Sequence, residues 1–161
     1  MLKKLNLLIL GFLFLVFTFS HSLVFAHEAE AMKVDHVATS FEKLKEKITL
    51  FLKFDKKNKV DYYEYLAEKR LAEIAYAVES NNIDLVEPTA SRYSTYIGIL
   101  TSFVDKNKVT DKKDDLVKMF EKHDRVLTDL QKKFKFESGW WLAIQHDINN
   151  TRIFSDKIKS L

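Results

Sequence analysis

The chain has 161 residues, with 26 Lys and Arg against 23 Asp and Glu, and it contains no cysteine. The absence of cysteine excludes disulfide bonds, thiolate metal sites, a cysteine nucleophile and a lipid attached through cysteine. Lys3 and Lys4 lie at the extreme amino terminus, and the charges of the remaining chain nearly balance. We therefore expect no nucleic-acid partner, which would need a clustered basic surface.

The first 26 residues have the layout of a secretory signal peptide. A short basic region precedes an apolar run at 7–19, and Val24-Phe25-Ala26 suits cleavage between Ala26 and His27. Left uncleaved, residues 5–26 approach the length of a membrane anchor, although Ser20-His21-Ser22 interrupts them. We expect a secreted or extracytoplasmic protein, in the periplasm or cell envelope. The alternative is a protein anchored in the membrane by residues 5–26.

Residues 27–38 are interpreted as a flexible lead, and residues 39–161 as one helical domain. After residue 11 the chain holds two glycines and one proline, fewer than strands joined by tight turns would need. Apolar residues recur at steps of three and four, which is typical of helices. The spacing predicts a short amphipathic helix at 40–53 and long helices at 59–80, 85–106, 112–136 and 139–159. Short connections make consecutive helices antiparallel neighbours, so the predicted fold is an all-α, up-down bundle.

The sequence contains no pattern of catalytic or metal-binding residues. The turns that begin at Asp55 and Asp105 lack the ligands of a calcium loop at the required positions. No Glu-x-x-His pair is present for a di-iron centre, and no Gly-x-Ser-x-Gly elbow presents a nucleophile. We therefore expect no enzyme, no cofactor and no metal.

Three aromatic or imidazole side chains remain as candidates. His123 lies on the apolar stripe of its helix, and we interpret it as a core group hydrogen-bonded to a neighbouring helix; the alternative is a ligand or a pH-sensitive group. Trp140 and Trp141 point about 100° apart on a helix, so one ring should enter the core and the other lie at its edge. An exposed ring would instead mark a surface that contacts a partner or a membrane.

The stretch LAEKRLAEIAYAVES, residues 66–80, combines a core stripe with a polar edge. Ala67, Leu71, Ile74 and Val78 form the stripe. Arg70 borders it, and we expect its stem to pack there while its guanidinium reaches towards solvent and bonds Glu73 or a tyrosine hydroxyl. The alternative makes Arg70 part of an interaction surface.

The residues Ala67, Arg70, Leu71 and Glu73 form an Ala-x-x-Arg-Leu-x-Glu helix, which is followed by an Asn81-Asn82 turn and by Tyr93. In these features residues 41–97 resemble a bacterial family of exported helical domains of unknown function. The resemblance implies an extracytoplasmic helical domain with Tyr93 on an inner face, and it supplies no activity.

The expected function is that of a non-enzymatic domain which acts through contacts with an unknown protein partner, in the cell envelope or outside the cell. The membrane would be reached only through an uncleaved signal segment. The alternative is an extracytoplasmic bundle that binds a small ligand or a metal.

Overall fold

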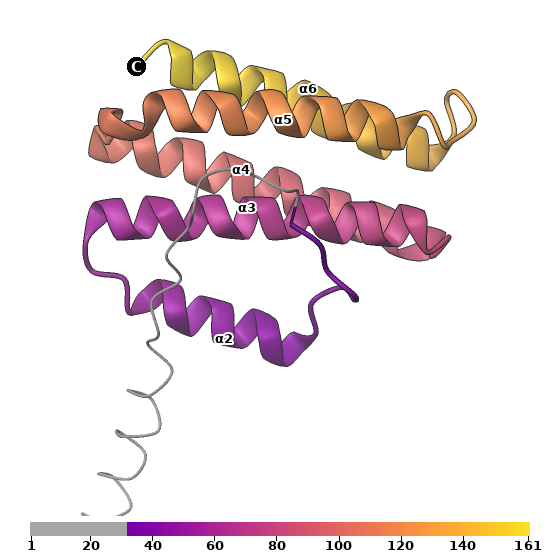
Figure 1. Cartoon of the computed structure of the whole chain (residues 1–161), viewed down its shortest axis with the longest axis horizontal. Coiled ribbons are helices and arrows are strands. Elements are labelled where there is room, and N and C mark those ends of the chain that lie inside the picture. Colours follow the sequence, from indigo (N-terminus) through magenta and orange to yellow (C-terminus); the bar gives the residue numbers. More distant parts are fainter. Residues whose placement is uncertain (1–31) are drawn as a thin grey trace, which may run out of the picture. The chain divides into compact units, whose positions relative to one another are not determined.

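The computed structural model describes residues 32–161, and these form five α-helices, two short 3₁₀ turns and no strand (Figure 1). The all-α class is therefore confirmed for this part of the chain. The predicted signal segment and the Ala26–His27 cleavage point lie outside the described residues. The helices are α2 (Ser40–Phe51), α3 (Lys56–Glu79), α4 (Val86–Asn107), α5 (Lys113–Gln131) and α6 (Gly139–Lys159), with 3₁₀ turns at Ile83–Leu85 and Thr110–Lys112.

Two helix boundaries differ from the sequence prediction for local reasons. Helix α3 begins before residue 59, because the Asp55 side chain accepts a hydrogen bond from the Asn58 N–H at 2.9 Å and caps the helix there. Helix α5 ends at Gln131 rather than near 136. The chain then turns, Glu137 takes a positive φ of 61°, and Ser138 caps the start of α6.

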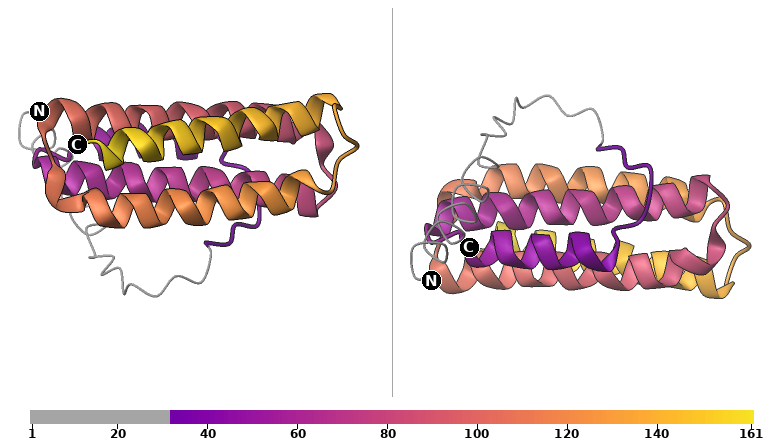
Figure 2. Two further views of the ribbon diagram at one scale, coloured as in Figure 1. Left: turned by 90° about the horizontal axis from the view of Figure 1, so that it is seen from above. Right: turned by 90° about the horizontal axis from the view of Figure 1, so that it is seen from below.

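The four long helices surround one hydrophobic core. Helix α3 packs against α4, α4 against α6 and α5 against α6, while α3 also contacts α5. Consecutive long helices run in opposite directions (Figure 2). Apolar residues spaced three and four apart along the long helices face this core, and the following ones are buried: Val60, Ala67, Leu71, Ile74, Val78, Val86, Ala90, Tyr93, Ile97, Leu100, Val104, Leu116, Phe120, Leu127, Leu130, Ile144, Ile148 and Ile158.

Helix α2 is not part of this arrangement of four. It lies along the outside of the bundle, beside α3 and α4 (Figures 1 and 2). A complete capping box holds its start, in which the Thr39 hydroxyl accepts from the Glu42 N–H and the Glu42 carboxylate accepts from the Thr39 N–H. Helix α2 is therefore well defined as a helix although it contributes nothing to the core cluster.

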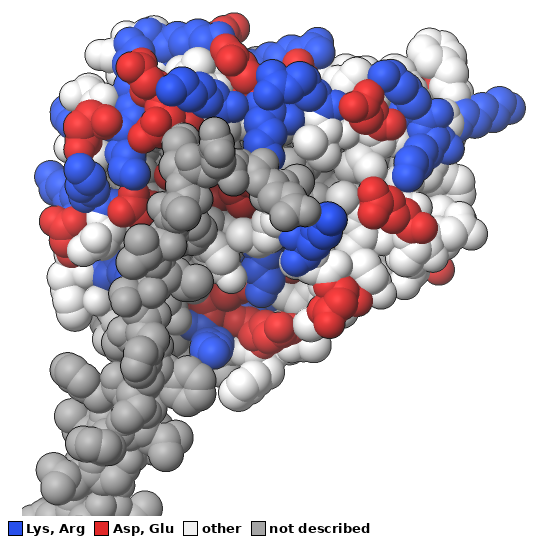
Figure 3. Space-filling view, viewed as in Figure 1, with Lys and Arg blue, Asp and Glu red and all other residues white. Residues whose placement is uncertain are grey.

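Charges of both signs lie on the surface of the bundle that faces the viewer in Figure 3. On the face shown in Figure 3, Lys and Arg side chains are interspersed with Asp and Glu. Within residues 32–161, no helix has the length and apolar character needed to cross a membrane.

Candidate functional site

Helix α2 turns its apolar side away from the bundle. Phe41 and Phe51 are each 76% exposed, and Leu44, Ile48 and Leu52 each expose about half of their surface or more. In a helix of 3.6 residues per turn these five positions fall within an arc of about 100°. We call them the outward face of α2. Phe54, in the loop that follows, is 86% exposed and continues this face.

The opposite side of α2 carries a buried carboxylate. Glu46 is only 6% exposed, and it is the one residue of α2 that counts as buried. Its carboxylate accepts hydrogen bonds from Lys69, at 2.7 Å, and from Arg70, both on α3. Amphipathic helices on globular proteins ordinarily bury the apolar side. Helix α2 does the reverse.

Beneath α2 lies a balanced set of charges, which we call the ion cluster: Glu46, Lys69, Arg70 and Glu73. Arg70 is fully buried and bonds both carboxylates. Burial opposes its charge, but Glu73 and Glu46 outweigh that effect and raise the pKa of Arg70. The guanidinium also lies over the Tyr96 ring of α4, 5.0 Å from its centroid. The cluster therefore joins α2, α3 and α4.

The segment that leads into α2 is tied to the same cluster. The backbone N–H of Ala38, a buried residue, donates to the Glu73 carboxylate at 3.1 Å. Arg92 of α4 approaches the other Glu73 oxygen, at 3.9 Å. Glu73 therefore holds both the entry to α2 and, through Arg70, its buried side.

The expectation that Arg70 snorkels to solvent is wrong, because Glu46 and Glu73 hold its guanidinium inside the protein. Full burial also excludes Arg70 from an exposed interaction surface. The sequence did indicate the pair with Glu73, from their i,i+3 spacing. It gave no signal for Glu46, which comes from another helix.

His123 is a fully buried core group that is hydrogen-bonded to Tyr93 of α4. Its Nδ1 lies 3.0 Å from the Tyr93 hydroxyl, which in turn lies 2.8 Å from the Thr151 hydroxyl. On the other side, His123 Nε2 lies 3.2 Å from a Glu68 oxygen. The four residues come from α5, α4, α6 and α3, so this polar chain touches every helix of the bundle.

The direction of these hydrogen bonds follows from the donors available. The Thr151 hydroxyl donates to the backbone carbonyl of Asp147 at 2.7 Å, so it must accept from Tyr93. Tyr93 has then used its only proton and must accept from His123. The network therefore assigns a proton to His123 Nδ1. Glu68 faces His123 Nε2 and accepts a hydrogen bond from Lys122.

Neither tryptophan enters the core, contrary to the expectation that one ring would. Trp140 is 37% exposed and packs against Phe134, while half-buried Trp141 packs edge-on against Phe136 at 4.9 Å between ring centroids. The early end of α5 explains this, because the turn after it brings both phenylalanines to the rings. The tryptophans cover the α5–α6 turn.

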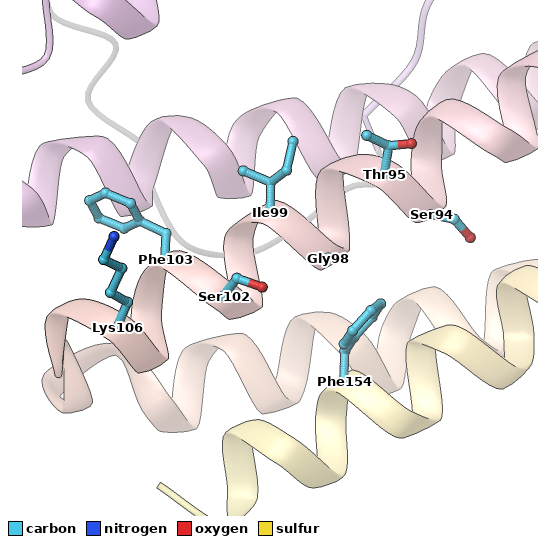
Figure 4. Close-up of a pocket in the computed structure, with 8 residues that line it drawn as sticks. All are labelled: Ser94, Thr95, Gly98, Ile99, Ser102, Phe103, Lys106 and Phe154. Atoms are coloured by element: carbon cyan, nitrogen blue, oxygen red, sulfur yellow. The ribbon is translucent and has the colours of Figure 1, made fainter.

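A shallow hollow of about 490 Å³ lies on α4 beside α6 (Figure 4). Phe154 of α6 points towards Gly98, where an added Cβ would come within 3.4 Å of its ring. The lining includes Ser94, Ser102 and Lys106 but no carboxylate or imidazole. The hollow therefore offers no acid–base pair for catalysis. In residues 32–161 no three His, Asp or Glu side chains are grouped as metal ligands would be.

Comparisons with curated proteins and with solved structures gave no match. A family model described as a domain of unknown function, DUF5667, matches residues 40–137. The match begins at the first residue of α2 and ends in the turn after α5. It therefore includes the outward face and the whole ion cluster. Because the model covers more than half of the sequence, the chain belongs to the DUF5667 family.

Proposed function

We propose that this protein is an exported, non-enzymatic contact module, in which an up-down bundle of α3–α6 is the rigid platform and α2 is the element that meets a partner. The layout of residues 1–26 supports export. The observation that carries the contact function is the orientation of α2, which exposes its apolar side and buries Glu46.

The two sides of α2 have opposing free-energy requirements. Five large apolar side chains in water forgo the stabilisation of about 25 cal/mol per Å² that burial provides. A buried carboxylate is stable only when it is paired, which here requires Lys69 and Arg70. Turning α2 over would bury the apolar side but take Glu46 away, which would leave Lys69 without its carboxylate and Arg70 with Glu73 alone. The chain thus fixes an orientation that leaves an apolar surface for another molecule.

Photo-crosslinking in the producing cell tests the contact function. A benzophenone amino acid replaces Ile48 in the outward face, and in a matched control it replaces exposed Lys118 on α5. We expect the probe at position 48 to give covalent adducts on irradiation and the probe at position 118 to give few. Equal yields at the two positions would contradict the proposal.

A further inference from the structure

We propose that the partner of α2 is the surface of an anionic lipid bilayer, with the helix lying in the plane of the interface and its outward face among the acyl chains. This inference rests on the proposed function, because it names what the contact face meets. It goes beyond the expectation that only the signal segment reaches a membrane.

Lysines border the outward face on both sides. Exposed Lys47 lies one helical turn from Leu44 and from Phe51, and exposed Lys45 lies one turn from Phe41. Lysine stems can follow the edge of an apolar surface while their ammonium groups stay in water. On a bilayer, this arrangement places both ammonium groups at the level of the lipid headgroups.

The carboxylates of α2 are turned away from the outward face. Glu46 is buried in the ion cluster. Glu42 is bonded to Thr39 in the capping box and to His36, and these bonds lower its pKa to about 2. An anionic surface would therefore meet the lysines without meeting either carboxylate.

The lysines that border the outward face argue against a protein partner. Interfaces between proteins are depleted in lysine, whereas helices that lie on membranes combine lysine with phenylalanine and leucine. Phe54 extends the apolar surface beyond the end of the helix. The combination of a phenylalanine-rich face and lysine borders therefore fits a bilayer better than a protein groove.

Vesicle flotation tests the inference with the chain that begins at His27. Residues 31–161 form a compact unit that contains the whole described core, so we expect this chain to fold without the signal segment, and circular dichroism checks that it does. The vesicles are phosphatidylcholine alone, or phosphatidylcholine with an equal part of phosphatidylglycerol. We expect binding to the mixed vesicles that weakens with salt, and much weaker binding to the neutral ones.

Matched variants locate the binding surface. The double variant Ile48→Ser with Phe51→Ser should lose at least about tenfold in binding, because it removes apolar contact area. Leu142→Ser with Ile153→Ser, on exposed positions of α6, should keep it. Lys45→Gln and Lys47→Gln should each weaken binding about fivefold. Lys118→Gln, on α5, and Lys133→Gln, in the turn after α5, are exposed positions outside α2 and should change it much less. Circular dichroism checks that each variant is folded.

Three results would overturn the inference: no binding to the mixed vesicles, equal losses in the α2 and α6 variants, or a dimer in sedimentation equilibrium that Ile48→Ser with Phe51→Ser converts to a monomer. The last would assign the face to a second copy of the chain. Protein adducts at position 48 without vesicle binding would overturn the bilayer partner and leave the contact function intact. If the vesicles bind but positions 48 and 118 give equal adduct yields in the cell, with lipid adducts included, the contact function itself is overturned.

Discussion

Arg70 shows how one residue decides the placement of a helix. Its guanidinium bonds Glu73 on its own helix and Glu46 on α2, and all three side chains are buried. An isolated buried charge is far more costly than a paired one, so the orientation of α2 depends on the match between these groups.

Replacing Arg70 with Met would keep much of the side-chain volume. It would leave Glu46 with Lys69 alone and Glu73 with only the more distant Arg92. We expect Arg70→Met to lower the free energy of unfolding by about 3–5 kcal/mol, the cost of breaking a buried ion pair. Arg152→Met is the control, because Arg152 pairs with Asp124 at the surface and should matter by less than about 1 kcal/mol. Urea denaturation measures both, and equal small losses would show that the ion cluster is solvated.

Asp147 makes stability depend on pH. It is 1% exposed, burial raises its pKa to about 7, and the Ser94 hydroxyl that donates to Oδ1 only partly opposes this shift. In the unfolded chain its pKa returns to about 3.8. Between pH values of about 3.8 and 7, Asp147 is protonated in the folded state and ionised in the unfolded state. The contribution of Asp147 to the free energy of unfolding therefore falls as the pH rises, and the loss is complete above about pH 7.

The variant Asp147→Asn removes this titration while its amide oxygen can still accept from Ser94. We expect it to be more stable than the native chain at about pH 8, by up to roughly 4 kcal/mol at 1.36 kcal/mol per pKa unit, and to gain little at about pH 4. Denaturation at the two pH values measures the difference. A gain that is the same at both would mean that Asp147 titrates normally.

At the scale of the element, α2 is held to the bundle by the ion pairs of Glu46 rather than by apolar contacts with the core. Glu46→Gln removes the charge that Lys69 and Arg70 bond, so we expect the amides of α2 to exchange hydrogen at least about tenfold faster while α3–α6 change less. Lys47→Gln, on the exposed side of the same helix, should leave exchange unchanged. Uniform acceleration in all helices would show that α2 and the bundle unfold as one unit.

The sequence allowed the long helices to be predicted but not the orientation of α2. On each of the helices α3–α6, apolar residues spaced three and four apart form a broad apolar side. The burial of Leu71, Ile74 and Phe120 follows from this spacing. The spacing of Phe41, Leu44 and Ile48 is equally regular, and it predicts an amphipathic helix without saying which side is covered. That choice depends on Arg70, which is distant in sequence, and on whether it finds a carboxylate.

The candidate site was accessible to sequence analysis only in part. The pairing of Arg70 with Glu73 follows from helical spacing, and His123 was predicted as a polar core group. Its partners Tyr93, Thr151 and Glu68 come from three other helices, so no local pattern contains them. The positions of Trp140 and Trp141 outside the core depend on where α5 ends, and no glycine or proline in residues 132–138 indicates that end.

At the scale of the whole molecule, the bundle provides the stability of the fold and α2 provides the exposed apolar face. The bundle completes its core without α2, and the polar chain through His123 ties its four helices together. The stability of the fold therefore does not require the outward face, which leaves that face available for contact. The central claim is that α2 holds this orientation in solution.

Cysteine labelling tests that claim most directly, because the native chain has no cysteine to interfere. Single cysteines replace Ile48 in the outward face and, as a buried reference, Ile74 in the core. The account predicts that the thiol at position 48 reacts with a maleimide in the folded protein about as fast as in urea, while the thiol at 74 is protected. Protection of position 48 in the folded monomer would mean that α2 buries its apolar side, and it would contradict the account.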